Sequence, residues 1–189
     1  MVAEDADLQL LGDADFAEFG SALDTSSDLD GDGIQDVVVG APGADDGAGK
    51  AQVFGLGLMM GEVSAEALAW ATYSGAPGRL GHAVKVPGDV DADGHRDLIL
   101  GAPDAGDGGT HVGASYLYWG STGPGTFAPD ASIESVDSWL GVGTSLGATS
   151  TSTTGSVDTL LVGGYGGDAS DTGEPEDEAG VLWVFRFAD

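Results

Sequence analysis

Two nine-residue loops rich in aspartate limit what this chain can fold into more than any other feature. One loop spans residues 28–36 and the other spans residues 89–97. Both have Asp at positions 1, 3, 5 and 9 and Gly at position 6. Three apolar residues and then Gly-Ala-Pro follow each loop, which predicts a short buried strand that ends at the glycine and proline. We therefore expect each loop to join two neighbouring strands.

The spacing of the aspartates predicts a cation site. Alternate residues of a tight loop point toward one centre, so the aspartates at positions 1, 3 and 5 converge, and the glycine at position 6 allows a sharp turn. Carboxylate oxygens are hard ligands of the kind that Ca²⁺ prefers. Ile34 and His95 occupy position 7, where only the backbone carbonyl is needed and the side chain is free to vary.

The loops differ from the calcium loop of an EF-hand. Position 12 is Val39 in one loop and Leu100 in the other, instead of an acidic ligand, and a short strand follows in place of a helix. An ordinary acidic hairpin turn is the alternative, because Asp and Gly are common turn residues. The identical spacing in two copies favours calcium over this alternative.

The loops belong to three repeat units, at about residues 6–57, 67–120 and 131–188, within a single domain of residues 1–189. Each unit contains about four short strand patterns separated by turn residues, with no helical period. The third unit has Ser and Thr in place of the aspartates, and Asp158 alone does not hold Ca²⁺, so we expect no metal there. Units of this length with four strands are typical of β-propeller blades. The expected fold is therefore all-β, a propeller-like array of three four-stranded antiparallel blades.

The units resemble the FG-GAP repeat family, whose members include the propellers of integrin α-chains and many bacterial surface proteins. The resemblance covers nearly the whole chain. It rests on Phe19-Gly20 with Gly40-Ala41-Pro42, on Leu80-Gly81 with Gly101-Ala102-Pro103, and on Leu140-Gly141 with Gly163-Gly164. The aspartate loops lie inside the first two pairs, and the distance between the two glycines is two residues longer in the third.

The resemblance implies blades of four antiparallel strands with Ca²⁺ in a hairpin loop on one face. In integrins the ligand surface lies on the opposite face, so the metal is structural. Carried over to this chain, the first calcium site consists of Asp28, Asp30, Asp32, the carbonyl of Ile34, and Asp36. The second consists of Asp89, Asp91, Asp93, the carbonyl of His95, and Asp97. No ligand-binding residue is carried over, because nothing in this sequence matches one.

The number of units raises the question of how the ring is completed. Integrin-type propellers have seven blades and propellers in general have four to eight, so three units do not close a ring. The alternatives are a fragment of a longer protein, an open arc of three blades, and a ring completed by oligomerisation, in which two copies supply six blades. Self-association is an expectation because an open arc exposes strand edges and sheet faces.

The charge of the chain restricts its partners. Asp and Glu number 32 against 5 Lys and Arg, which gives a formal net charge of −27; two Ca²⁺ ions add +4 and leave −23. Such a surface repels nucleic acid and anionic membranes, although a salt-adapted surface is equally acidic. No run of eighteen apolar residues is present to insert into a membrane, and there are no cysteines to form disulfides. Residues 1–7 lack the features of a signal peptide, so the signal of an exported protein lies outside this chain.

Three patterns that suggest catalysis are weaker than the calcium loops. Residues 143–147 fit G-x-S-x-G, but a Ser/Thr run follows where a nucleophile elbow needs a helix. His82, His95 and His111 lack the spacing of zinc ligands. Pairs of carboxylates are abundant enough for a glycosidase, but most are already assigned to the calcium loops or to exposed turns.

We therefore expect a non-catalytic, calcium-binding module, secreted or displayed at the cell surface, that serves in adhesion, in binding a protein or carbohydrate, or as a scaffold. Loops 43–49, 104–113 and 166–179 are candidates for contacting a partner, since loops on a rigid scaffold often carry function. Two alternatives stay open: an accessory propeller of a secreted hydrolase or lyase, and a purely structural, self-assembling propeller fragment.

Overall fold

The computed structural model describes residues 6–57, 60–106, 112–121, 123–135, 140–149, 157, 159–166 and 180–187. These residues form fourteen strands and two helices of four residues each, which confirms the all-β prediction. The strands are β1 (Leu8–Leu11), β2 (Ala22–Ser27), β3 (Asp36–Ala41), β4 (Lys50–Gly55), β5 (Gly61–Ser64), β6 (Ala71–Tyr73), β7 (Ala83–Gly88), β8 (Asp97–Ala102), β9 (Ala114–Tyr118), β10 (Gly125–Phe127), β11 (Ala131–Glu134), β12 (Val142–Thr149), β13 (Thr159–Gly164) and β14 (Val181–Arg186). The helices are α1 (Ala44–Gly47) and α2 (Ala65–Leu68), and within the described residues no helix has the length and hydropathy needed to cross a bilayer.

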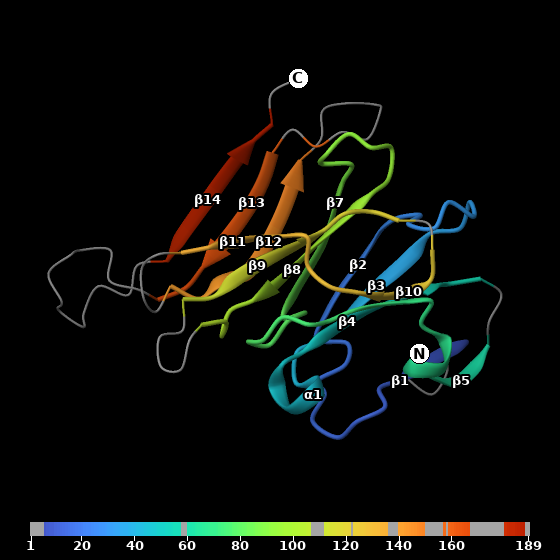
Figure 1. The fold of residues 1–189 in the computed structure, drawn as a ribbon. Helices are drawn as coiled ribbons and strands as arrows, with labels where there is room; N and C mark the ends of the chain where they lie inside the picture. The colour runs from blue at the N-terminus through green and yellow to red at the C-terminus, as the bar shows by residue number, and fades with distance from the viewer. Residues whose placement is uncertain are drawn as a thin grey trace, which may run out of the picture.

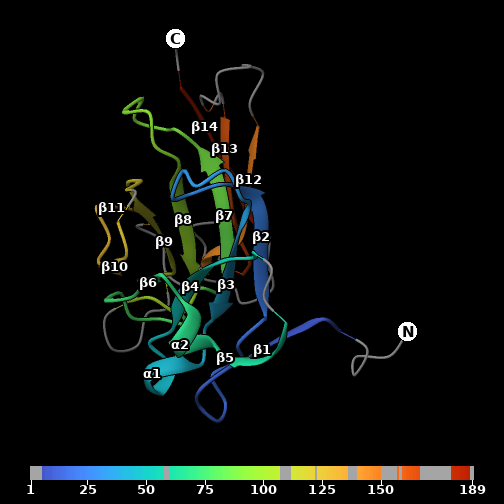
Figure 2. The ribbon, with the colours of Figure 1, turned by 90° about the vertical axis from the view of Figure 1, so that its right-hand side faces the viewer.

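Three sheets stand face to face, as Figures 1 and 2 show from two directions. The first sheet has the strand order β10-β6-β4-β3-β2, the second β11-β9-β8-β7, and the third β12-β13-β14. Their inner strands contact one another in chain order, β2 against β7 and β7 against β12. A small ribbon of β1 and β5 lies beside the first sheet (Figure 1). The arrangement is propeller-like, and the described strands form an arc that does not close into a ring.

The fourth strand of a sheet comes from the next sequence unit. β6 pairs antiparallel with β4, and β11 pairs antiparallel with β9, although both strands open the sequence units that follow. A strand's hydrophobic pattern is the same whichever sheet it joins, so the sequence does not distinguish the two arrangements. The second sheet has the predicted four strands. The first sheet gains β10, parallel to β6, and the third sheet has three strands in the part of the chain that the structure describes.

The third sheet aligns with the other two at Val142-Gly143, two residues beyond the Leu140-Gly141 pair that the sequence suggested. In each sheet the residue two places after the first motif glycine pairs with the second motif glycine. The pairs are Ala22 with Gly40, Ala83 with Gly101, and Ser145 with Gly163. Isolated parallel bridges agree, joining Gly49 to Leu80 and Gly113 to Val142. The two glycines are thus equally spaced in all three repeats, and the apparent two-residue insertion disappears.

Neighbouring sheets touch backbone to backbone at glycines. A Cβ atom on Gly40 would lie 2.0 Å from the carbonyl oxygen of Gly81, and one on Gly101 would lie 1.8 Å from the carbonyl oxygen of Gly143. Gly81 and Gly143 have φ angles of 86° and 88°, in the left-handed region that favours glycine. The sheets approach this closely because no side chain is present at either surface.

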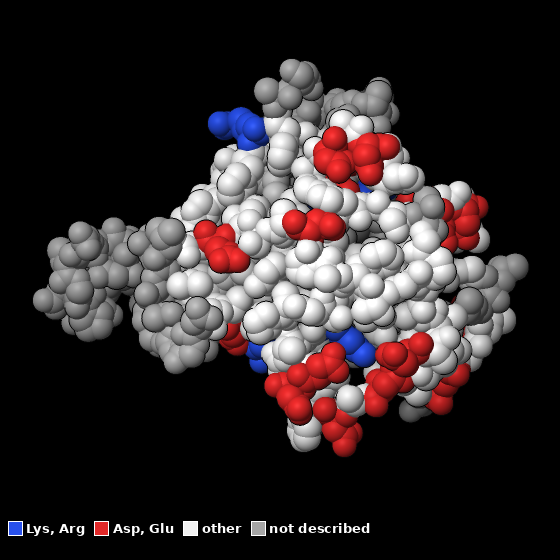
Figure 3. Space-filling view, in the orientation of Figure 1, with Lys and Arg blue, Asp and Glu red and all other residues white. Residues whose placement is uncertain are grey.

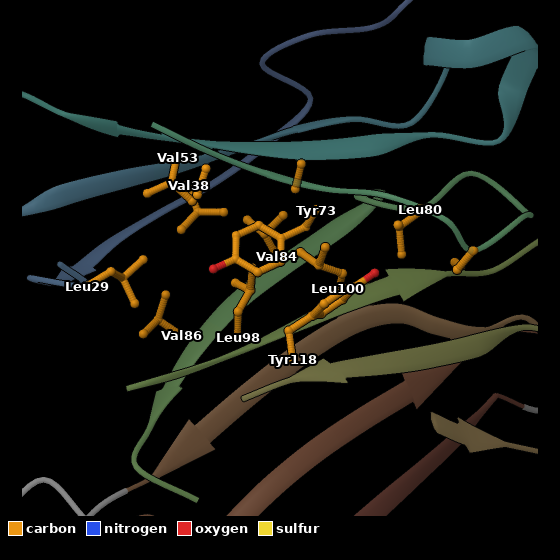
Figure 4. Close-up of a cluster of buried hydrophobic side chains, with 14 of the residues drawn as sticks. Leu29, Val38, Val53, Tyr73, Leu80, Val84, Val86, Leu98, Leu100 and Tyr118 are labelled. Atoms are coloured by element: carbon orange, nitrogen blue, oxygen red, sulfur yellow. The ribbon is translucent and has the colours of Figure 1, made fainter. Parts of the chain in front are cut away.

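Apolar side chains fill the space around these contacts. Figure 4 shows Val38 and Val53 of the first sheet facing Leu98, Leu100 and Tyr118 of the second, and each of these residues is at most 2% exposed. A second cluster lies between the second and third sheets. Its buried members are Ile99, Leu117, Leu140, Val142, Leu160 and Val162. Each internal interface is therefore a dry apolar layer with a glycine contact at one end.

We predict that Gly101→Ala destabilises the protein, because the new methyl group forces the second and third sheets apart. The free energy of unfolding should fall by about 1–3 kcal/mol or more, as in other overpacked interiors. Gly57→Ala is the control, since a Cβ atom there meets nothing within 4 Å, and its effect should stay within about 0.5 kcal/mol. Urea unfolding measures both; equal stabilities for the two variants would contradict the glycine contact.

Candidate metal centres

The two aspartate loops connect equivalent strands. Residues 28–36 lead from β2 into β3, and residues 89–97 lead from β7 into β8. Both hairpins carry an irregularity in the strand before the loop, between Asp24 and Ser27 in the first and between Lys85 and Gly88 in the second. Figure 1 shows both connections toward the upper end of the molecule. Two loops with the same spacing thus occupy the same place in two sheets.

Three carboxylates converge in each loop. Oxygen atoms of Asp28, Asp30 and Asp36 lie within 4.8 Å of one another, and so do oxygen atoms of the corresponding aspartates of the second loop. Those are Asp89, Asp91 and Asp97. The set is composed only of carboxylate oxygens, which is the donor chemistry that Ca²⁺ takes, so these residues fit the ion that the sequence predicts.

The remaining predicted ligands lie on the same loops outside these clusters. The Oδ1 atoms of Asp32 and Asp93 accept hydrogen bonds from the backbone N–H groups of Ile34 and His95, at 2.7 and 2.8 Å. The side chain of Ile34 is 44% exposed, in keeping with a position where the side chain is free to vary. The roles of Asp32, Asp93 and the two carbonyls as ligands stay predictions.

The first aspartate of each loop organises the turn. Asp28 accepts hydrogen bonds from the N–H groups of Gly31 and Gly33 at 2.7 and 2.9 Å. Asp89 does the same for Asp93 and Gly94 at 3.1 and 3.0 Å. Each loop therefore closes around its first carboxylate. These local hydrogen bonds hold the carboxylates near one another despite the repulsion between their negative charges.

The ninth aspartate ties each loop to the protein interior. Asp36 and Asp97 are only 2% and 1% exposed. Asp36 accepts a hydrogen bond from the N–H of Leu29 at 2.7 Å and one from the indole Nε1 of Trp70 at 3.4 Å. These contacts hold the carboxylate of Asp36, one of the three in the first cluster, in place at the start of β3.

The two hydrogen bonds that the described residues make to Asp97 come from backbone groups. Asp97 accepts them from the N–H groups of Val90 at 2.6 Å and Gly120 at 2.8 Å. A Cβ atom on Gly120 would lie 2.4 Å from the carbonyl oxygen of Arg96, so a glycine is needed for this approach. Sequence reasoning missed both Trp70 and Gly120, because neither lies in an aspartate loop or in a repeated motif.

Burial makes the ninth aspartates hard to ionise. Desolvation raises the pKa of Asp36, and the charge of Asp30 adds to this effect. Desolvation likewise raises the pKa of Asp97 from 3.8 to about 6, against the opposing hydrogen bonds from Val90 and Gly120. Within the described residues, no ion pair with Lys, Arg or His engages the aspartates of either loop. A cation would supply the missing positive charge at both clusters.

Acidic side chains are also abundant elsewhere on the surface. Figure 3 shows Asp and Glu gathered at the top and bottom of one face, with few Lys or Arg among them. Three of the five basic side chains form ion pairs: Lys50 with Glu66, Lys85 with Asp24, and Arg79 with Glu18, with Asp104 at 3.8 Å from Arg79 as well. Acidity alone is therefore not the feature that distinguishes the loops; the convergence of three carboxylates is.

The raised pKa values predict an unusual pH dependence for the calcium-free protein. Because the folded state holds a proton on Asp97 more tightly than the unfolded chain does, stability should rise as the pH falls from 7 to 5. The melting temperature in calcium-free buffer measures this effect.

A matched variant separates this residue from the general relief of negative charge. Asp97→Asn removes the titrating group, so its melting temperature should rise less over the same pH range than that of the parent. Identical pH profiles for the two proteins would contradict the proposed ionisation of Asp97.

Comparison with known proteins places these loops in repeats of a known kind. Residues 19–54 and 86–118 match the FG-GAP repeat family. Similar proteins include integrin alpha-PS2 of Drosophila melanogaster, with 36% identity over 111 residues, or 54% of this chain and 8% of that protein. Integrin alpha-V of Gallus gallus is 38% identical over 91 residues, or 46% of this chain and 9% of that protein.

A second group of similar proteins consists of enzymes. Phosphatidylinositol-glycan-specific phospholipase D of Bos taurus is 37% identical over 134 residues, which cover 65% of this chain and 16% of that protein. The chain thus spans less than a fifth of the length of each of these relatives.

Proposed function

We propose that this chain, whose residues 19–54 and 86–118 are FG-GAP repeats, is a calcium-braced propeller module that binds a partner outside the cell and catalyses no reaction. One observation carries the proposal: equivalent loops of the two repeats bring three carboxylates together in the same way. A chance acidic turn has no reason to repeat this geometry at the same place in two sheets.

Calcium would act as a brace. Asp28, Asp30 and Asp36 would hold one ion, with Asp32 and the carbonyl of Ile34 completing the shell. The corresponding residues of the second loop, Asp89, Asp91, Asp97, Asp93 and the carbonyl of His95, would hold the other. The ion supplies positive charge that cancels the repulsion among carboxylates. It would link the half-buried first aspartate of each loop to the buried ninth aspartate, and so stiffen the hairpin. The third repeat is expected to lack a site; its loop lies outside the described residues.

An extracellular setting suits such sites. Calcium modules that work outside cells bind the ion at about 10⁻⁴ to 10⁻³ M, which matches loops open to solvent on one side. We accordingly propose that the protein is secreted or displayed at the cell surface. The similarity to integrin α-chains supports this assignment.

We place partner binding at the end of the sheets opposite the metal loops. The β3–β4 connection lies there, because a strand carries its two connections at opposite ends. Asp45 and Asp46 in this connection are exposed and have φ angles of 53° and 58°, a left-handed conformation that costs energy in residues other than glycine. A protein or carbohydrate ligand is the proposed partner.

A second candidate function follows from the similarity to phosphatidylinositol-glycan-specific phospholipase D over 134 residues. On this alternative the module accompanies a catalytic domain in the same polypeptide and contributes no reacting group itself. A coding sequence that continues into a hydrolase domain would favour this candidate over a free-standing adhesion module.

We predict that Ca²⁺ at 10 mM stabilises the chain. With dissociation constants near 10⁻⁴ to 10⁻³ M, each site should add about 1.4 to 2.7 kcal/mol, and two sites should raise the melting temperature by roughly 5 to 20 °C. Thermal melts with Ca²⁺ and with chelator measure the shift.

Four variants, two single substitutions, their combination and a control, assign the stabilisation to the two sites. Asp30→Asn and Asp91→Asn each remove one converging charge while keeping an oxygen for the local hydrogen bond, so each should lose about half of the shift and the double variant nearly all of it. Asp45→Asn, an exposed aspartate in the β3–β4 connection, should keep the full shift. A double variant whose melting temperature rises with Ca²⁺ as much as that of the parent protein would contradict the calcium proposal.

A further inference from the structure

Each sheet presents two faces to its neighbours, and the internal repeat makes these faces comparable. The trailing face of a sheet is defined here as three equivalent positions on two adjacent strands (β3 and β4, β8 and β9, or β13 and β14), matched through the residues with which they pair. The positions are Val38, Ala51 and Val53 in the first sheet, Ile99, Ser115 and Leu117 in the second, and Leu161, Leu182 and Val184 in the third. In the first two sheets this face packs against the following sheet.

The trailing face of the third sheet is exposed. The six equivalent residues of the first and second sheets are between 0% and 7% exposed, whereas Leu182 is 61% exposed and Val184 is 44% exposed. Val184 has the same strand position and apolar character as the buried Val53 and Leu117, and Leu182 has the strand position of the buried Ala51 and Ser115. The third sheet thus ends in an interface surface that has no sheet against it within the described residues.

The opposite, leading face of the first sheet is open around Leu23, whereas its other apolar side chains, Val37, Val39 and Phe54, are buried against residues of β1 and α2. Val84 of the second sheet is 8% exposed beneath the first sheet, but its equivalent Leu23 is 62% exposed. An apolar hollow of about 450 Å³ lies beside Leu23, lined by residues that include Leu10, Phe19 and Val39. Gly81 and Gly143 lie against the preceding sheet, while a Cβ atom on their equivalent, Gly20, would meet nothing within 4 Å.

Strand pairing shows which backbone contacts a further sheet would make at each end of the array. β10, which follows the second sequence unit, pairs in parallel with β6, an outer strand of the first sheet, and β5, which follows the first unit, pairs in parallel with β1 in the same way. β1 also has the position of an outer strand, because it precedes Gly20 by the same distance as β11 precedes Gly143. Among the described strands, β1 pairs with β5 alone and β14 pairs with β13 alone.

We propose that two copies of this chain associate head to tail, with the trailing face of the third sheet of each copy against the leading face of the first sheet of the other. The two surfaces are the halves of an interface that the chain already forms twice internally. β1 of one copy would pair antiparallel with β14 of the other, as β6 pairs with β4. Two such contacts related by a two-fold axis close a ring of six sheets, within the four to eight known for propellers.

Charge sets the conditions for this association. Each chain carries a formal charge of −27, so the two copies repel each other at low ionic strength. The docking surfaces themselves are apolar, since they consist of leucine, valine and phenylalanine side chains. Association should therefore strengthen with salt, and the proposal does not depend on calcium.

Sedimentation equilibrium of the full chain in 1 M NaCl with chelator tests the inference. We expect a dimer of twice 18.8 kDa. Leu23→Lys and Val184→Lys, each at an exposed position, should give folded monomers, verified by circular dichroism. Phe16→Lys, at a side chain that is 92% exposed and does not line the hollow, should leave the dimer intact.

Mixing the two monomeric variants tests the head-to-tail geometry. A Leu23→Lys chain keeps its trailing face and a Val184→Lys chain keeps its leading face, so the mixture should form a heterodimer through one intact contact. A monomeric parent protein would overturn the proposal and assign these faces to other sheets of a longer polypeptide. The proposal would also be overturned if the Leu23→Lys and Val184→Lys variants both stayed dimeric, or if the parent protein formed open-ended polymers in place of a dimer. None of these results bears on the calcium sites, which the melts test separately.

Discussion

The backbone contact between glycines of neighbouring sheets is the constraint on which the rest of this structure depends. Gly40 meets Gly81, and Gly101 meets Gly143, at distances that no side chain permits. The contact recurs at the same position in each repeat. Each sheet therefore packs against the preceding sheet in the same way. The apolar layers and the positions of the connecting loops follow from that repeated placement.

The metal loops use the same scaffold at the ends of the hairpins. Their tips are shaped by hydrogen bonds between aspartates and nearby backbone N–H groups, and their bases are fixed by Asp36 and Asp97, which are buried against the sheets. A loop of this kind concentrates negative charge in a preformed position. The free-energy cost of that charge is what a divalent cation would remove, and this links the stability of the hairpins to the ion.

Much of this arrangement is readable from the sequence, and the exceptions have physical causes. The aspartate spacing located both clusters, and the apolar triplets before each Gly-Ala-Pro identified β3 and β8. The glycine alignment of the third repeat was wrong, because Leu140-Gly141 resembles the motif locally while Gly143 makes the contact with the preceding sheet. The grouping of β6 and β11 with the preceding sheets, and the supporting roles of Trp70 and Gly120, depend on tertiary contacts that a repeat pattern does not encode.

The central claim is that two equivalent hairpins each hold one calcium ion. Anomalous diffraction from crystals grown with Ca²⁺ addresses it most directly, because the signal locates the ions without reference to stability. The account predicts two anomalous peaks per chain, one among Asp28, Asp30 and Asp36 and the other among Asp89, Asp91 and Asp97. Ordered loops with no peak at either cluster, or ions bound only at other acidic residues of the chain, would contradict it.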